Sequence, residues 1–81
     1  MNIPDDAFYG LVTQGMRQRT DETLQRALYH TLRHAILQGT LAASCRLPGS
    51  RVIAGRLHLS RNTVNAALEQ LTLEGYLTRS R

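Results

Sequence analysis

The sequence predicts a mainly α-helical fold, a bundle of three helices with a further helix before them. Aliphatic residues recur every three or four positions in three segments, which places them on one face of each expected helix. The chain has 81 residues with three tyrosines, one phenylalanine and no tryptophan, so its one small core must be largely aliphatic. The three segments are 20–39, 51–57 and 60–75.

The first nineteen residues predict a short amphipathic helix that begins near Asp5. Gly10 and Gly15 each weaken such a helix by about 1 kcal/mol relative to alanine. We therefore expect this helix to need a partner surface before it becomes ordered. Phe8 and Leu11 lie on its apolar face and are candidates for a contact with a second subunit or another domain.

Residues 20–39 predict the scaffold helix of the bundle. Thr20 is the expected N-cap, and Asp21 and Glu22 suit the positive end of the helix dipole. Gly39 ends the helix. On the solvent side, His30 and His34 are expected to be hydrated rather than to bind a metal. The apolar stripe consists of Leu24, Leu28, Leu32 and Ile36.

Two shorter helices follow, joined by three residues. Ser50 is the expected N-cap of a helix over Arg51–Leu57, and Ser60 is that of a helix ended by Gly75. The second of these helices places four residues on its buried face. Tyr76-Leu77-Thr78 is the predicted start of a β-strand. The buried four are Val64, Ala67, Leu68 and Leu71.

The charge distribution favours nucleic acid as the partner. The net charge is +4, all basic residues are arginines, and no carboxylate occurs between Thr23 and Leu68. Six guanidinium groups in that interval should create a positive potential that attracts a polyanion. They belong to Arg26, Arg33, Arg46, Arg51, Arg56 and Arg61.

Composition also excludes several classes of protein. A single cysteine, Cys45, cannot form an internal disulfide, so we expect a reducing compartment and a cytoplasmic location. No apolar run approaches the roughly 18 residues of a membrane span. No catalytic grouping, metal cluster or phosphate loop is visible, which predicts a protein that is not an enzyme and a chain without a cofactor or metal site.

The two short helices have the spacing of a helix-turn-helix, whose second helix enters the major groove of DNA with its N-terminus first. With the apolar stripe in the core, helical geometry turns Asn62, Asn65 and Ala66 outward and places Arg61 and Thr63 at the flanks. Arginine can pair with guanine, asparagine with adenine, and a small alanine with the thymine methyl group. This face therefore predicts sequence-specific reading of double-stranded DNA.

Three blocks of sequence resemble the GntR family of bacterial transcription regulators. They occur in order at the family's spacing, and the likeness runs from about Leu24 to the C-terminus. The residues of the third block look most like those of the MocR subfamily. The blocks are Leu47-Pro48-Gly49-Ser50-Arg51, Ser60-Arg61-Asn62-Thr63-Val64 and Leu71-Thr72-Leu73-Glu74-Gly75-Tyr76-Leu77.

The resemblance implies a winged helix-turn-helix domain over residues 20–81, with 1–19 as an N-terminal extension and a truncated or minimal β wing from Thr78. His58 stands where the family usually has glycine, a position that often needs positive φ. The predicted DNA-binding residues are Arg51, Ser60, Arg61, Asn62, Thr63 and Asn65, together with Arg46 and Arg79.

The resemblance further implies that members of the subfamily join this domain to an aminotransferase-like domain that binds pyridoxal phosphate. The chain has no lysine and so cannot itself form the Schiff base with that cofactor. Helix-turn-helix readers commonly bind two half-sites, so a homodimer is an expected partner arrangement. Two alternatives stay open: a winged-helix module that binds acidic protein surfaces, and a HutC-like regulator with a small-molecule effector domain.

Overall fold

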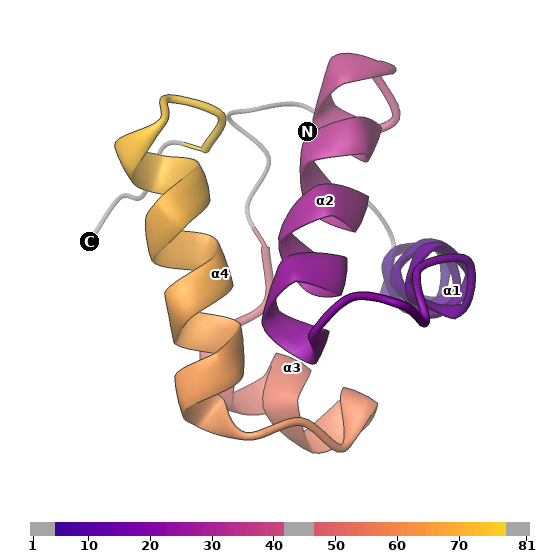
Figure 1. The fold of residues 1–81 in the computed structure, drawn as a ribbon, viewed down its shortest axis with the longest axis vertical. Helices are drawn as coiled ribbons and strands as arrows, with labels where there is room; N and C mark the ends of the chain where they lie inside the picture. Colours follow the sequence, from indigo (N-terminus) through magenta and orange to yellow (C-terminus); the bar gives the residue numbers. More distant parts are fainter. Residues whose placement is uncertain (1–4, 42–46, 78–81) are drawn as a thin grey trace.

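The computed structural model describes residues 5–41 and 47–77, which form four helices around one core (Figure 1). Helix α2 packs against α4 on one side and against α1, which is seen nearly end-on in this view, on the other, and α3 contacts both α4 and α1. The predicted mainly α bundle is confirmed, including its N-terminal helix. The helices are α1 (Asp5–Arg17), α2 (Leu24–Leu37), α3 (Ser50–Leu57) and α4 (Arg61–Leu73).

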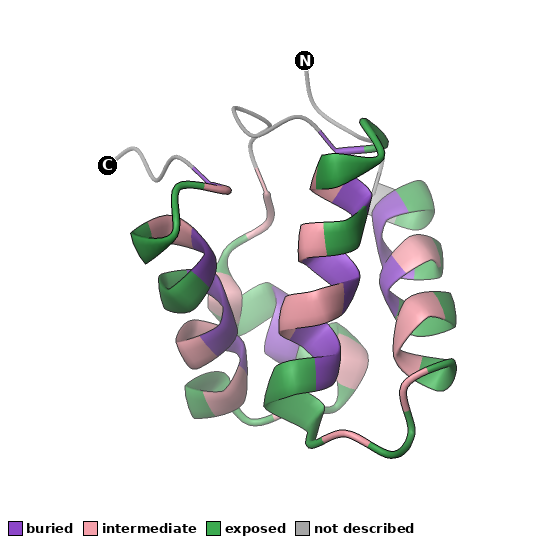
Figure 2. Ribbon diagram, turned by 45° about the horizontal axis from the view of Figure 1, so that its top comes forward, coloured by how far each residue is buried: buried purple, intermediate pink, exposed green. Residues whose placement is uncertain are grey.

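The core is built mainly from aliphatic side chains of all four helices. Figure 2 shows the buried positions as a continuous inner face of α1, α2 and α4, with exposed positions turned outward. None of the described helices is long and apolar enough to cross a membrane. The largest fully buried side chains are Phe8, Val12, Leu28, Leu32, Leu41, Ile53, Val64 and Leu71.

Helix α2 begins three residues later than the sequence pattern predicts. Thr23, not Thr20, is the N-cap, and its hydroxyl accepts a hydrogen bond from the Arg26 amide at 3.2 Å. The preceding residues cannot be helical because they form the turn from α1, in which the Glu22 amide bonds to the Arg19 carbonyl at 3.2 Å. Leu24 is consequently 58% exposed, although the predicted apolar stripe includes it.

Two other local predictions need correction. Ser50 is the first residue of α3 rather than its N-cap, because the extended backbone of Gly49 already precedes the helix and no side-chain cap bond forms. Tyr76 and Leu77 are not in a strand. Their amides bond instead to the carbonyl of Leu71, which folds this segment back against the end of α4. The wing predicted from Thr78 lies outside the described residues.

Each of the helices α2, α3 and α4 ends at a residue with left-handed backbone. Gly39 ends α2 and Gly75 ends α4, with φ of 82° and 84°, as predicted. His58 ends α3 with φ of 56°, so the residue that replaces the family's usual glycine retains the glycine conformation. At each end an amide reaches back five residues: Thr40 to Ala35, Leu59 to Ala54 and Tyr76 to Leu71.

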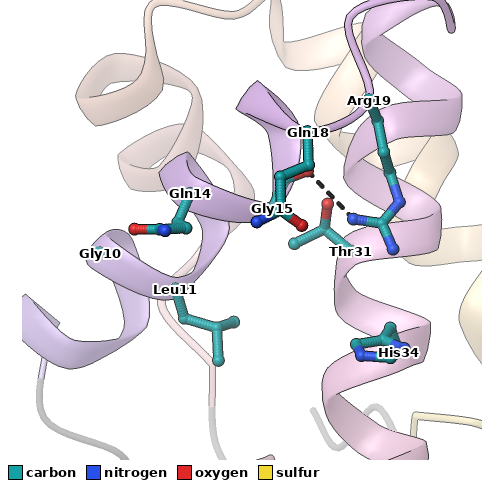
Figure 3. A pocket seen from close by; sticks show the side chains of 8 residues that line it. All are labelled: Gly10, Leu11, Gln14, Gly15, Gln18, Arg19, Thr31 and His34. Atoms are coloured by element: carbon teal, nitrogen blue, oxygen red, sulfur yellow. Dashed lines mark hydrogen bonds between the residues drawn. The ribbon is translucent and has the colours of Figure 1, made fainter.

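Helix α1 finds its partner surface within the chain. Phe8 is fully buried in the shared core, so it is unavailable for the contact with a second subunit that its apolar character predicted. Gly15 lies directly against Thr31 of α2 (Figure 3). A Cβ atom at position 15 would lie 2.9 Å from the Thr31 hydroxyl oxygen and 3.1 Å from its Cβ. The glycine that weakens α1 as an isolated helix thus permits its docking.

A polar cluster joins the middle of α2 to the end of α4. The Tyr29 hydroxyl donates a hydrogen bond to the Glu74 carboxylate, which also accepts one from the Gln70 amide. Beside them, the Arg33 Nε donates to the Tyr76 hydroxyl at 3.0 Å, and its guanidinium lies 5.2 Å from the centre of that ring. These contacts hold the residues that follow α4 against the scaffold helix.

The two glycines of α1 predict opposite effects of alanine. Gly10→Ala meets no atom within 4 Å and should stabilise the protein by about 0.5–1 kcal/mol, because it removes backbone freedom from the unfolded chain. Gly15→Ala should destabilise it by about 1–2 kcal/mol, because Thr31 is buried and stiff about χ1. Urea unfolding followed by circular dichroism measures both changes. A stabilising Gly15→Ala would contradict the close contact.

The polar cluster predicts a loss of stability in acid. Hydrogen bonds from Tyr29 and then Gln70 lower the pKa of Glu74 below its ordinary value of 4.5. The folded chain binds the proton of the Glu74 carboxyl less tightly than the unfolded chain does. The contribution of Glu74 to the free energy of unfolding is therefore complete above about pH 4.5 and is lost as pH falls through the pKa of the folded state. Unfolding free energies should therefore decline less steeply below that pH in Glu74→Gln than in the parent chain.

Glu69→Gln is the matched control for this measurement, since Glu69 is an exposed carboxylate on the same helix. It should leave the acid limb of the stability curve closer to that of the parent chain than Glu74→Gln does. If the two variants changed the acid limb equally, the cluster would not be the source of the pH dependence.

Candidate nucleic-acid interface

The start of α4 is fixed by a side-chain cap and by burial of one face. Ser60 has extended backbone, and its hydroxyl accepts a hydrogen bond from the Thr63 amide at 3.1 Å. The predicted inner face is confirmed: its four apolar residues are all buried against the rest of the core. With one face fixed inward, the opposite face of the first two turns must point to solvent. The buried residues are Val64, Ala67, Leu68 and Leu71.

The predicted reading residues come together on that outward face. Arg61 and Asn62 are exposed on the first turn, and Thr63, Asn65 and Ala66 are partly exposed beside them. Arg61, Asn62 and Asn65 supply guanidinium and amide groups, and Ala66 contributes a methyl group. This set can present donors, acceptors and an apolar contact to the edges of base pairs. The structure therefore gives these side chains the placement that the sequence predicts, while their contacts with DNA stay a prediction.

The hydroxyls of Ser60 and Thr63 are already engaged with each other. Their oxygens lie 2.7 Å apart, and the Thr63 amide is bound by Ser60. Hydroxyls and free backbone amides at the start of a helix are groups that suit phosphate oxygens. The cap leaves the amides of Arg61 and Asn62 without an acceptor within the helix, as at the start of any α-helix. These two amides are the backbone donors best suited to a phosphate.

Helix α3 precedes α4 and helps to hold its first turn in place. It packs against α4, and the left-handed backbone of His58, with φ of 56° and ψ of 41°, makes the tight connection between them. Arg51 is exposed on the first turn of α3. This arrangement is the helix-turn-helix predicted from the three-residue spacing.

Among the described residues, Arg56 pairs with neither Glu69 nor Glu74, the two carboxylates that follow it in the sequence. Its guanidinium carbon lies 4.4 Å from the centre of the Tyr9 ring, on α1. Glu74 is instead bound by Tyr29 and Gln70. Sequence reasoning missed Tyr9 altogether, because the pairing of α1 with α3 could not be inferred from the periodicity of either helix.

The arginines of the candidate interface are not neutralised by described carboxylates. Within 5–41 and 47–77, the ion pairs involve Glu22, which lies 4.0 Å from Arg19 and also contacts the His30 ring. The sequence predicts that His30 is hydrated, but its ring is hydrogen-bonded to Glu22. Neither Arg51 nor Arg61 has an ion-pair partner there. Arg46 and Arg79, the other two predicted DNA-binding arginines, lie outside the described residues.

A groove of about 510 Å³ lies between α1 and α2 (Figure 3). Its lining includes Arg19, His34 and the close contact of Gly15 with Thr31. The Arg19 guanidinium, however, already donates to the Gly15 carbonyl at 3.0 Å and lies near Glu22. The groove is formed on the side of α2 that faces α1 and not α4, so it is separate from the candidate interface.

Comparison with known proteins agrees with this geometry. A probable rhizopine catabolism regulatory protein, MocR, of Rhizobium meliloti is 47% identical over 57 residues, which are 70% of this chain. The uncharacterized HTH-type transcriptional regulators YdeL and YisV of Bacillus subtilis are each 32% identical, over 82% and 74% of this chain. The matches cover only 12%, 14% and 12% of these relatives. No solved structure matches.

The profile of the family described as "Bacterial regulatory proteins, gntR family" matches residues 24–81. That segment contains α2, α3 and α4, and therefore the whole of the helix-turn-helix and the face presented by α4. Helix α1 precedes it. The chain belongs to the gntR family of bacterial regulatory proteins, of which it carries the helix-turn-helix DNA-binding domain.

Proposed function

We propose that α4 is the recognition helix of a sequence-specific operator-binding domain and enters the major groove with its N-terminus first. The observation that carries this proposal is the outward face of the first two turns of α4. There Arg61 and Asn62 are exposed, Asn65 is partly exposed, and no carboxylate occurs between Thr23 and Leu68. A face of this kind offers hydrogen-bonding groups to bases without repelling the phosphates on either side.

The proposed roles follow from the chemistry of each side chain. Arg61 pairs with the O6 and N7 atoms of a guanine, and Asn62 or Asn65 pairs with an adenine. Thr63, whose hydroxyl is hydrogen-bonded to that of Ser60, contacts the sugar-phosphate backbone of the DNA at the edge of the groove. Arg51 on α3 neutralises a phosphate, which fixes the orientation of α4. We assign the same backbone role to Arg46 and Arg79.

We propose further that this chain is the DNA-binding part of a longer cytoplasmic regulator, and that this part is not an enzyme. The regulator acts as a homodimer on paired half-sites. The small share of each relative that the chain spans supports the longer protein, and the common use of paired half-sites by helix-turn-helix proteins supports the homodimer. Pyridoxal phosphate would then belong to a separate domain. The chain contains no lysine, so none of its residues can form the imine by which that cofactor is held.

Specific binding can be tested by selection, which requires no assumed operator. Duplexes selected from a random library should converge on a shared motif, and the selected duplex should bind more tightly than a scrambled duplex of the same composition. Affinity should fall steeply with salt, by about 0.9 in log K per log salt for each phosphate neutralised. Fluorescence anisotropy measures both. Failure of the selection to converge would refute sequence-specific reading, and a flat salt dependence would refute binding to phosphates.

Substitutions at position 61 separate base reading from charge. Arg61→Ala should reduce affinity for the selected duplex by about 1–3 kcal/mol and bring it closer to that for the scrambled duplex. Arg61→Lys keeps the positive charge but lacks the planar fork, so it should lose discrimination while retaining most of the salt dependence. Asn62→Ala should relax selectivity at a different base pair.

Arg17→Ala is the matched control for these variants, because Arg17 is an exposed arginine on α1, across the bundle from α4. It removes the same charge and should leave discrimination between the two duplexes unchanged. If Arg61→Ala and Asn62→Ala bound both duplexes as the parent chain does, with unchanged circular dichroism, the alternative of a protein-interaction module would be favoured instead.

A further inference from the structure

We infer that α1 is a working part of the DNA-binding unit, and that Tyr9 positions the helix-turn-helix through Arg56. Helix α1 lies outside the segment that the family profile matches, so its role does not follow from family membership. The inference rests on the proposed function of α4. It adds a positioning residue, Tyr9, that touches no DNA in the proposed arrangement.

Helix α3 is poorly secured by its own burial. It has eight residues, and its buried residues are Ile53 and Ala54 alone. Gly55 lies in its second turn, with no atom within 4 Å of the position that a side chain there would occupy. A two-turn helix that contains a glycine has little stability of its own, so its position depends on the elements packed against it. Those elements are α4 and α1.

Helix α1 offers α3 a rigid attachment. Tyr9 is 6% exposed, and its ring packs edge-on against Phe8, which is fully buried, with ring centres 5.2 Å apart. The Arg56 guanidinium carbon lies 4.4 Å from the centre of the Tyr9 ring. A cation over the face of a buried aromatic ring is attracted by the ring's quadrupole, so the last turn of α3 is tied to a buried part of the core.

The point of attachment lies next to the turn that sets the direction of α4. Arg56 precedes the left-handed residue His58 by two positions, and α4 begins three residues after His58. A shift in the last turn of α3 would therefore move the start of α4, which carries Arg61 and Asn62. If the position of α4 that binds DNA is populated for a smaller fraction of the time, the apparent affinity for DNA falls in proportion to that fraction.

The side on which Arg56 lies also matters. The guanidinium lies over the Tyr9 ring of α1, and α1 and α4 lie on opposite sides of α2 (Figure 1). Arg56 thus differs from Arg51 and Arg61, which have no partner among the described residues. Its charge serves the contact between α1 and α3 rather than the binding of a phosphate.

A double-substitution cycle on the full chain tests this inference. Tyr9→Leu and Arg56→Gln should each lower affinity for the selected duplex by about two- to fivefold, the size of one exposed cation–π contact. The double variant should lose no more than either single one, because both remove the same contact. Tyr9→Phe, which keeps the ring, should bind nearly as the parent chain does.

Two readouts distinguish positioning from other roles. The slope of log K against log salt should be unchanged in all of these variants, whereas loss of a phosphate contact lowers it by about 0.9. Affinities are measured at a temperature where circular dichroism shows every variant to be fully folded, so that a simple loss of stability has no effect on them. Arg56 is a surface residue, and Arg56→Gln keeps the test valid even if Tyr9→Leu fails to fold.

Several results would overturn the inference. A reduced salt slope in Arg56→Gln would make Arg56 a phosphate contact, and additive losses in the double variant would make the two residues independent. Unchanged affinity in both single variants, with Arg61→Ala still defective, would reject the role of α1 while leaving the proposed function intact. If the parent chain selected no duplex at all, the proposed function and the inference would fall together.

Discussion

The burial of one face of α4 against α2 is the constraint on which the rest of the structure depends. Val64 and Leu71 are fully buried seven residues apart, and Leu28 and Leu32 of α2 meet them in the same core. Because an α-helix turns by a fixed angle at each residue, fixing this stripe leaves no choice about what the opposite side presents. The exposure of Arg61 and Asn62 is thus a result of core packing as much as of their own polarity.

Much of this arrangement could be read from the sequence, because α4 and the turn before it obey strong local rules. Ser60 is a favoured N-cap, Gly75 is a favoured C-terminal residue, and the four apolar positions between them follow the helical spacing without a gap. His58 adopts the backbone that the missing glycine would have had. Local chemistry and tertiary packing agree here, so the predicted inner face and the ends of α4 are confirmed, while the contacts of its outward face with DNA stay a prediction.

Several of the predictions that were wrong concern contacts between elements distant in the chain. Thr20 and Thr23 are equally acceptable caps, and the turn that joins α1 to α2 selects Thr23. Phe8 was expected to face a partner, yet it lies in the core because α2 offers α1 a place to dock. Arg56, one of the six arginines of the interval without carboxylates, lies over the Tyr9 ring of α1, a contact that the sequence does not indicate. Neither periodicity nor capping preference carries information about such pairings.

The contact between Gly15 and Thr31 has a consequence for how α1 can move. Many helix pairs slide or rotate by small amounts, because their side chains can exchange one set of grooves for another. Here Gly15 occupies a point where a Cβ atom would lie closer to the Thr31 side chain than van der Waals contact permits. A shift of α1 by one residue would bring Gln14 or Met16 to that point, where neither fits. The close contact therefore permits the docking of α1 on α2 in a single register.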